Sequence, residues 1–490
     1  MPTRARSPEE FARRWMRRWK VPGASVAVVE RGRPTVTRAY GYRNRERRLP
    51  ATARTAYGLA SVTKSFTALA ILMLQEAGKL SVQDPVVRYL PGFRTPDPRW
   101  TRRIRIHHFL THSSGLPPLP SIYYTSMRST QQAPPYDPKD ARRVGIDPDH
   151  APIDSYEQML DFLATARYRP LGPPGRVFSY SNEGFGLLGA VIEAVTDRTH
   201  ESYLDEAILR PAGMRSTTYD TGVLFRYPER TTLYSPRWTG TRHGFVPSET
   251  WWEDNCLRAC GGLRSTVDDL ARYLQLYVDD GRVDGERIVS AASMRALTTP
   301  HVPLGSGVSY GYGVMVAPDH PAGPLVTHTG GLPGVSSCFV AAPKRGVAAV
   351  VLSNAEGVSA ALVAQAELNA RLGLPLDAEF STPPPPAPAG RPLADYAGWY
   401  ASGEGIWLEV RTRPDGLRFD FRGIEVTARN LTLRPAGDDA FLLRYGGQRG
   451  AIRFRRDDRG RVTGVFLGSR VLRRRSRAEL RGARRGTTVW

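Results

Sequence analysis

One apolar run limits the folds that this chain can adopt. It follows an S-x-x-K tetrapeptide at residues 61–64: residues 66–74 are almost continuously apolar, and Gly78 comes shortly afterwards. The pattern predicts a helix that begins just before Ser61 and ends at Gly78, because glycine readily adopts the left-handed conformation that ends helices. Apolar residues lie on nearly every face of this helix, so we expect it to be buried in a large core.

The same tetrapeptide contains a candidate nucleophile. Ser61 and Lys64 are three residues apart and would share one face of a helix. A serine hydroxyl becomes a useful nucleophile when a neighbouring group takes its proton. A lysine amine can take that proton when it is uncharged, and burial favours the uncharged form of an amine. S-x-x-K also occurs by chance on solvated turns, and its position before an apolar helix makes catalysis an equal alternative.

Composition limits the partners of the chain. A length of 490 residues predicts two or three domains at about 150 residues each. The net charge is +21, and almost all of the basic residues are arginines interspersed with acidic residues. We therefore expect no nucleic-acid interface, and a small molecule or short peptide as the substrate. The sequence does not indicate an oligomeric state.

Cysteines and apolar runs bear on cofactors and location. Cys256, Cys260 and Cys338 are too few for a disulfide framework, so buried free thiols are favoured over a Cys256–Cys260 pair. No metal-ligand spacing involves them, and we expect neither a metal nor a cofactor. The N-terminus is polar and basic, and no run of about 18 apolar residues occurs, which predicts a soluble, cytoplasmic protein. An export signal is the alternative if translation starts further upstream.

The order of strand and helix signals predicts an α+β domain over residues 1–374. It consists of an antiparallel sheet flanked by helices, with an inserted helical subdomain. Residues 117–153 have no clear period, and we interpret them as a lid over a pocket or as a surface loop. The sheet strands are expected at residues 24–30, 35–41, 310–317, 325–329, 336–342 and 347–353.

The remaining chain predicts a second, smaller domain. Residues 375–392 are proline-rich and read as a semi-rigid linker. Residues 393–473 contain six short strand signals about ten residues apart, which indicates a small antiparallel β-barrel or sandwich. Residues 474–490 form an arginine-rich tail, which we expect to be solvated.

Two further motifs add candidate site residues. Tyr180 and Asn182 form a Y-x-N at the start of a predicted helix. A tyrosine near Lys64 could relay protons to a leaving group, and the asparagine amide could orient the lysine. The alternative is a core aromatic residue followed by a helix cap. The second motif, His328-Thr329-Gly330-Gly331, ends a predicted strand, where a glycine would let substrate lie along the strand edge. Alone, it also fits a strand end with a turn.

Together the three motifs resemble the serine β-lactamase and penicillin-binding-protein superfamily. The likeness covers about residues 8–372 and is greatest to the branch of class C β-lactamases, D-Ala-D-Ala carboxypeptidases, D-aminopeptidases and esterases. Supporting stretches are Leu59–Lys64, Thr111–Leu116 and Gly261–Thr266. The C-terminal domain resembles the lipocalin-like barrel of the D-aminopeptidase relatives.

The resemblance implies a role for each candidate residue. Ser61 would be the acylated nucleophile, Lys64 and Tyr180 the base and acid, and Asn182 an orienting contact. The N–H groups of Ser61 and Gly331 would form the oxyanion hole, with Thr329 and Gly330 beside the substrate. These roles imply a serine hydrolase that cleaves an amide or ester bond, with a D-amino-acid peptide as one possible substrate. A penicillin-binding sensor or scaffold without turnover is the alternative from another class.

One position departs from the lactamase pattern. Lactamases have a lysine in K-T-G where this chain has His328. A permanent cation suits a substrate carboxylate better than a histidine that is largely neutral at pH 7. The departure weakens the penicillin-hydrolysing and carboxypeptidase interpretations, and favours the D-aminopeptidase and esterase relatives.

Overall fold

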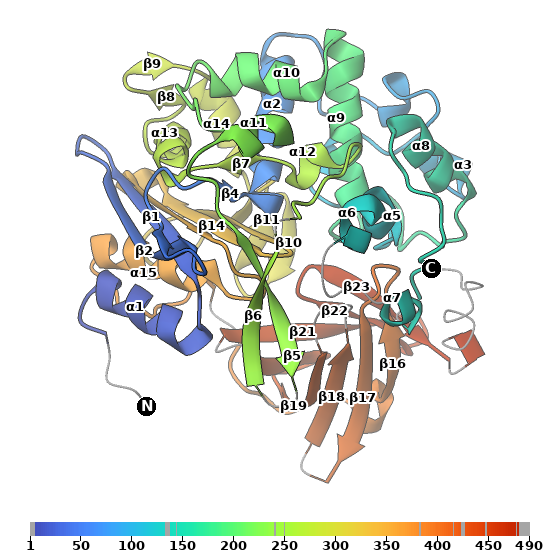
Figure 1. Ribbon diagram of the computed structural model, residues 1–490. Coiled ribbons are helices and arrows are strands. Elements are labelled where there is room, and N and C mark those ends of the chain that lie inside the picture. The colour runs from blue at the N-terminus through green and yellow to red at the C-terminus, as the bar shows by residue number, and fades with distance from the viewer. Residues whose placement is uncertain are drawn as a thin grey trace.

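A large antiparallel sheet forms the centre of the protein (Figure 1). The computed structural model describes residues 5–132, 138–143, 145–239, 242–248, 250–381, 384–414, 416–422, 427–445, 448–476 and 478–479. The nine strands lie in the order β10-β11-β12-β13-β14-β15-β1-β2-β3, so the N-terminal hairpin pairs with strands from much later in the chain. Their bounds are β1 Gly23–Glu30, β2 Val36–Asn44, β3 Leu49–Pro50, β10 Val302–Gly305, β11 Val308–Tyr310, β12 Met315–Ala317, β13 Leu325–Leu332, β14 Val335–Ala342 and β15 Val347–Ser353.

Both faces of the sheet are buried under helices. Alternate residues of a strand point to opposite faces, and Val26 and Val28 of β1 pack in one apolar cluster while Ala27 and Val29 pack in another. The first cluster includes α1 (Pro8–Trp19) and α15 (Ala360–Leu372), which lie on the opposite side of the sheet from α13 (Val267–Val278) in Figure 1. Because both faces are covered, the central strands of the sheet consist almost entirely of buried, mostly apolar residues.

The buried helix that the sequence predicts is α2, Thr63–Glu76, with Gly78 in the left-handed region at φ +70°. Its start differs from the expectation, because Ser61 lies before α2 in a short 3₁₀ turn, Ala60–Val62. Ala60 has a φ of +47°, which an α-helix does not accommodate. The α-helix can therefore begin only after this turn.

Helices around α2 form the helical subdomain. The principal ones are α8 (Tyr156–Thr165), α9 (Asn182–Thr196), α12 (Arg258–Gly261) and α14 (Ala291–Thr298). The irregular stretch at 117–153 contains three short helices, α5 (Ser121–Thr125), α6 (Met127–Gln132) and α7 (Pro138–Arg143). No helix among the described residues has the length and apolar character to cross a membrane.

The C-terminal domain is a closed barrel of eight antiparallel strands, β16 to β23, drawn at the bottom of Figure 1. The predicted fold class, a sheet-and-helix domain followed by a small barrel, is confirmed. Two of the eight strands, β16 and β23, carried no strand signal in the sequence. The strands are β16 Gly398–Ala401, β17 Trp407–Arg413, β18 Gly416–Arg422, β19 Thr427–Pro435, β20 Ala440–Tyr445, β21 Gln448–Arg456, β22 Val462–Leu467 and β23 Arg470–Arg475.

The segments flanking the barrel are only partly covered by the structure. In the predicted linker, Ala387 forms an isolated bridge to Ala436 of the barrel, and residues 382–383 lie outside the described residues. At the other end, β23 extends to Arg475, so the first residues of the predicted basic tail belong to the barrel. Most of that tail, residues 480–490, lies outside the described residues.

Candidate active site

Two sheet strands hold the turn that carries Ser61. The hydroxyl of Ser337 on β14 donates a 2.6 Å hydrogen bond to the carbonyl oxygen of Leu59. Gly330 on β13 packs against the same carbonyl, so closely that a Cβ at Gly330 would lie 2.2 Å from the oxygen. Ala60 then takes its left-handed conformation, a strained backbone of the kind that concentrates at functional sites. The turn is thus fixed against the sheet directly before Ser61.

Lys64 lies on the first turn of α2 and is fully buried. Its Nζ is 3.2 Å from Ser61 Oγ, 2.9 Å from Asn182 Oδ1 and 2.8 Å from the carbonyl oxygen of Cys260. Two of these neighbours are carbonyl oxygens, which can only accept hydrogen bonds. The third, the serine hydroxyl, can also donate one. The structure therefore brings the predicted serine, lysine and asparagine together.

Asn182 is the first residue of α9, and the start of that helix fixes its position. The Ser181 side chain caps the helix by accepting from the backbone N–H of Gly184 at 3.1 Å. The capping serine also donates to the carboxyl group of Glu183 at 2.7 Å. Burial raises the pKa of Glu183, with a further contribution from Glu404. Capping thus places the Asn182 amide where Lys64 can donate to it.

Tyr180 is buried beside Lys64. The centroid of its ring lies 4.8 Å from Lys64 Nζ, and the ring of His112 lies 4.0 Å away. The lysine therefore contacts the aromatic ring itself, which is a favourable place for a cation. His328 is also near, with ring centroids 6.2 Å apart. Tyr180, Lys64 and His328 come from three distant parts of the chain and meet at one place.

The H-T-G-G segment lies on β13, with alternating exposure. His328 and Gly330 are buried, and Thr329 and Gly331 are exposed. A Cβ on Gly331 would meet no atom within 4 Å, so this position borders open space. Gly331 is therefore an exposed position of β13, and its oxyanion role stays a prediction.

A chain of hydrogen bonds fixes His328 as a neutral side chain. The N–H of Ser181 donates to His112 Nδ1 at 3.0 Å, which leaves the other ring nitrogen of His112 as a donor to the Tyr310 hydroxyl at 3.2 Å. The Tyr310 hydroxyl then donates to His328 Nε2 at 3.0 Å, and His328 Nδ1 donates to the carbonyl oxygen of Thr329 at 2.7 Å. In this chain His112, Tyr310 and His328 each donate one hydrogen bond and accept one, so neither histidine needs a second ring proton.

The pKa shifts of the same groups agree with that order. Burial, together with the nearby Lys64, lowers the pKa of His328 to about 3. Burial likewise lowers the pKa of His112 well below its usual value and raises that of Tyr310 well above its usual value. All three groups are therefore uncharged at neutral pH. The sequence reasoning did not single out Tyr310 or His112, although His112 lies in the Thr111–Leu116 stretch that supports the resemblance.

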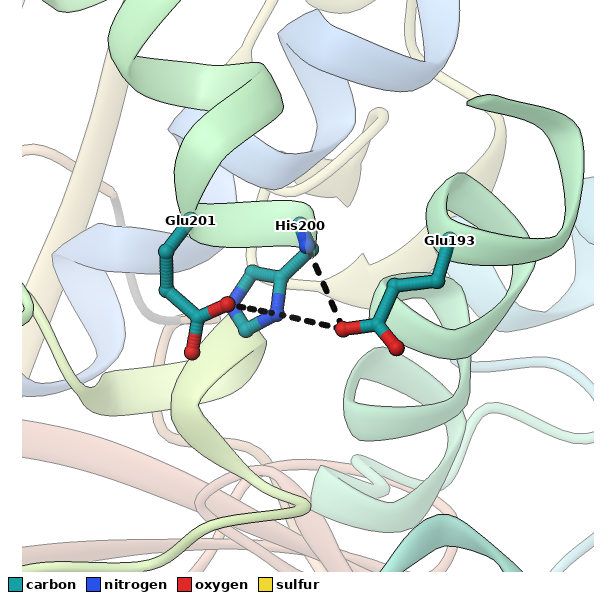
Figure 2. Close-up of side chains that lie close together, drawn as sticks. All are labelled: Glu193, His200 and Glu201. Carbon is teal, nitrogen blue, oxygen red and sulfur yellow. Dashed lines mark hydrogen bonds and ion pairs between the residues drawn. The ribbon is translucent and has the colours of Figure 1, made fainter. Parts of the chain in front are cut away.

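One group of side chains away from these motifs has the composition of a metal site. Glu193, His200 and Glu201 lie close together at the junction of α9 and α10 (His200–Leu204), as Figure 2 shows. His200 Nδ1 is 3.1 Å from Glu201 Oε2, and the His200 backbone N–H donates to Glu193 Oε1 at 3.2 Å. Arg258 forms an ion pair with the other oxygen of Glu201 at 3.2 Å. Because these contacts already engage the ligand atoms, the group is best explained as joining the two helices.

Comparisons with known proteins place this architecture in a family. The profile of the Beta-lactamase family matches residues 10–372. The chain is 26% identical over 437 residues to Penicillin-binding protein 4* of Bacillus subtilis, covering 86% of this chain and 87% of that protein. It is also similar to the octameric penicillin-binding protein homologue from Pyrococcus abyssi, with a TM-score of 0.66, 28% identity, and coverage of 95% and 98% of the two chains. A penicillin binding protein from Bacillus halodurans matches with a TM-score of 0.55, 25% identity, and coverage of 73% and 98%. The chain therefore belongs to the Beta-lactamase family.

Proposed function

We propose that this protein is a serine hydrolase that forms an acyl-enzyme at Ser61 and cleaves an amide or ester bond in a small substrate. The observation that carries the proposal is the environment of Lys64. An uncharged amine has two hydrogens and one lone pair. In the uncharged form that catalysis requires, Lys64 donates its two hydrogens to Asn182 Oδ1 and the Cys260 carbonyl, which leaves the lone pair for Ser61 Oγ at 3.2 Å. The amine is thus oriented to take the serine proton.

The reaction proceeds in two proton-coupled halves. Lys64 accepts the Ser61 proton while Oγ attacks the substrate carbonyl carbon, and the resulting oxyanion binds the N–H groups of Ser61 and Gly331. The Tyr180 hydroxyl protonates the leaving nitrogen or oxygen and regains a proton from the lysine ammonium. Water then attacks the acyl-enzyme with the same groups in reversed roles, which releases the acid and restores Ser61.

The substrate that we favour is a D-amino-acid peptide, with ester and β-lactam hydrolysis as alternatives within the same chemistry. The neutral His328 supports this choice, because it does not supply the strand cation that would recognise a substrate carboxylate. Several relatives are named as penicillin-binding proteins, so a fluorescent penicillin is a necessary probe. A protein that is acylated by penicillin without turnover would be a sensor or scaffold instead.

The test is the Ser61→Ala variant. Wild-type protein should react with a fluorophosphonate at Ser61, located by mass spectrometry of the labelled peptide, and should turn over an ester or a D-amino-acid peptide. The alanine variant should lose both, and its melting temperature should stay close to that of the wild type, because the hydrogen bond that the Ser61 hydroxyl makes within the described residues is the one with Lys64.

A matched control is Ser65→Ala. Ser65 lies one turn further along α2, where its hydroxyl donates to the Val62 carbonyl and accepts from Tyr273 in the core. We expect this variant to keep its labelling even if it melts earlier. Full turnover by Ser61→Ala, or labelling at another residue, would refute the proposed function.

A further inference from the structure

The last hairpin of the barrel reaches the candidate active site. The turn between β22 and β23 lies along the Y-x-N segment, where the backbone N–H of Tyr180 donates to the carbonyl oxygen of Ser469 at 3.0 Å. Phe466, near the end of β22, packs edge-on against Phe178, with ring centroids 5.8 Å apart. The C-terminal domain therefore contributes a wall beside the tyrosine.

This turn brings a cation from the barrel to the tyrosine. The guanidinium carbon of Arg470 lies 4.3 Å from the centroid of the Tyr180 ring, and Lys64 Nζ lies 4.8 Å from the same centroid. Such distances are within the range of cation–π attraction, which is stronger where water is excluded. The Tyr180 ring is thus in contact with the Lys64 amine from the first domain and the Arg470 guanidinium from the barrel.

A second barrel loop keeps Arg470 in place and charged. Glu404, which is almost fully buried, lies 2.6 Å from Arg470 Nε and 3.4 Å from its Nη2. Burial alone would lower the pKa of Arg470, but the Glu404 carboxylate outweighs burial and raises it. The loop is itself held against the helical subdomain, since the Gly403 N–H donates to the Pro118 carbonyl at 3.0 Å.

We infer that Arg470 is a positioning residue for Tyr180, and that the barrel thereby completes the active site. Its guanidinium holds the tyrosine ring beside Lys64 and favours negative charge on the phenol oxygen while the proton passes to the leaving group. The inference rests on the proposed function, because it assigns Arg470 to the same proton transfer. Among the described residues, the titratable rings that contact the Tyr180 ring are His112, Tyr310 and His328, all of them uncharged.

The alternative is that Arg470 only anchors the barrel. Variants that differ in charge at residues 470 and 404 distinguish the positioning role from the anchoring role. Arg470→Met removes both the ion pair and the positive charge, whereas Glu404→Gln removes only the negative charge and keeps an amide oxygen that can accept from the Arg470 guanidinium. An anchoring role predicts similar losses in both variants. The positioning role predicts a loss of kcat in Arg470→Met and none in Glu404→Gln.

The experiment measures kcat and KM for an ester that the full-length wild type turns over, together with thermal melting. We expect Arg470→Met to lose about 10- to 100-fold in kcat with little change in KM, because general acid catalysis contributes about 10²–10⁴-fold. Arg470→Lys should recover part of that loss, and Glu404→Gln should stay within about threefold of the wild type. Arg461→Met is the matched control, since Arg461 is an exposed barrel arginine paired with Asp457 at 2.8 Å.

The outcomes separate the inference from the proposed function. Equal losses in Arg470→Met and Glu404→Gln, or an Arg470→Met variant as active as Arg461→Met, would overturn the role of Arg470 alone. Wild-type protein that is neither labelled nor active on esters or amides would overturn the proposed function and this role with it. If Arg470→Met fails to fold, the folded Glu404→Gln variant decides, because a loss of more than about tenfold there would refute the charge argument.

Discussion

Two adjacent glycines on β13, Gly330 and Gly331, should differ sharply in their tolerance of an alanine. A Cβ at Gly330 would lie 2.2 Å from the Leu59 carbonyl oxygen and 2.2 Å from Ser337 Oγ, whereas real Cβ atoms hardly ever approach a heavy atom within 3.0 Å. A Cβ at Gly331 would meet no atom within 4 Å. Gly330→Ala therefore forces the strand and the Ser61 turn apart, and Gly331→Ala adds a methyl group in open space.

The size of the effect follows from that geometry. Relieving the contact at Gly330 requires a shift of roughly 1 Å, and overpacking of this kind costs about 1–3 kcal/mol of stability. For the larger domain this corresponds to a fall in melting temperature of about 1–2 °C per kcal/mol. The same shift moves Ser61 relative to β13, which would supply the oxyanion contact in the proposed function, and a misplacement of about 1 Å can lower the rate about 100-fold.

The assay compares the two alanine variants by thermal melting and by the rate of fluorophosphonate labelling at Ser61. Gly330→Ala should melt lower and label slowly, whereas the stability of Gly331→Ala should stay within about 0.5 kcal/mol of the wild type. Labelling of Gly331→Ala reports on substrate access instead, because its methyl group borders open space. Wild-type stability and labelling in Gly330→Ala would refute the view that the sheet positions the serine.

Two further predictions concern the buried polar groups. Asn182→Ala removes one of the two carbonyl acceptors that orient Lys64, so kcat for an ester should fall about 10- to 100-fold. The unpaired buried donor should also lower the stability by about 1–3 kcal/mol, and an unchanged kcat would contradict this orientation. Folding lowers the pKa of His328 from an ordinary 6.5 to about 3. Between these values the unfolded chain binds more protons than the folded protein, so stability should be lost as the pH falls below 6.5. At pH 5 this amounts to about 2 kcal/mol, so His328→Asn should show a smaller drop in melting temperature between pH 7 and pH 5 than the wild type; equal drops would contradict the assignment.

Local sequence patterns predicted the parts of the site that lie within single elements. Apolar residues on all faces of 66–74 identified the buried helix, and the Y-x-N before a glycine- and leucine-rich segment located the start of α9. The beginning of α2 could not be predicted in the same way. It depends on the left-handed backbone of Ala60, and alanine has no preference for that conformation.

Contacts between distant segments were beyond these patterns. Tyr310 joins His112 to His328 through one hydroxyl, and none of the three side chains indicates its partners in the sequence. The sequence predicts a solvated arginine-rich tail at residues 474–490, and no pattern assigns a role to the arginines just before it. In the structure, Arg470 contacts Tyr180, and Arg473 donates to the carbonyl oxygen of Pro170 at 2.8 Å. Charge in β23 thus marks a contact between domains, which composition alone does not distinguish from a surface in solvent.

The neutral His328 on β13 and the charged Arg470 of the barrel together decide where positive charge lies in the candidate site. His328 donates to Thr329 and accepts from Tyr310, so it has neither a charge nor a free donor for substrate. A lysine at this position would place a second ammonium group near Lys64 and break the hydrogen-bond chain. The cation that contacts Tyr180 besides Lys64 is instead Arg470, which a buried carboxylate compensates. In the proposed mechanism, positive charge therefore acts on Tyr180 and not along β13, where the substrate would lie. This arrangement favours selection of substrates by shape and backbone contacts over selection by a carboxylate.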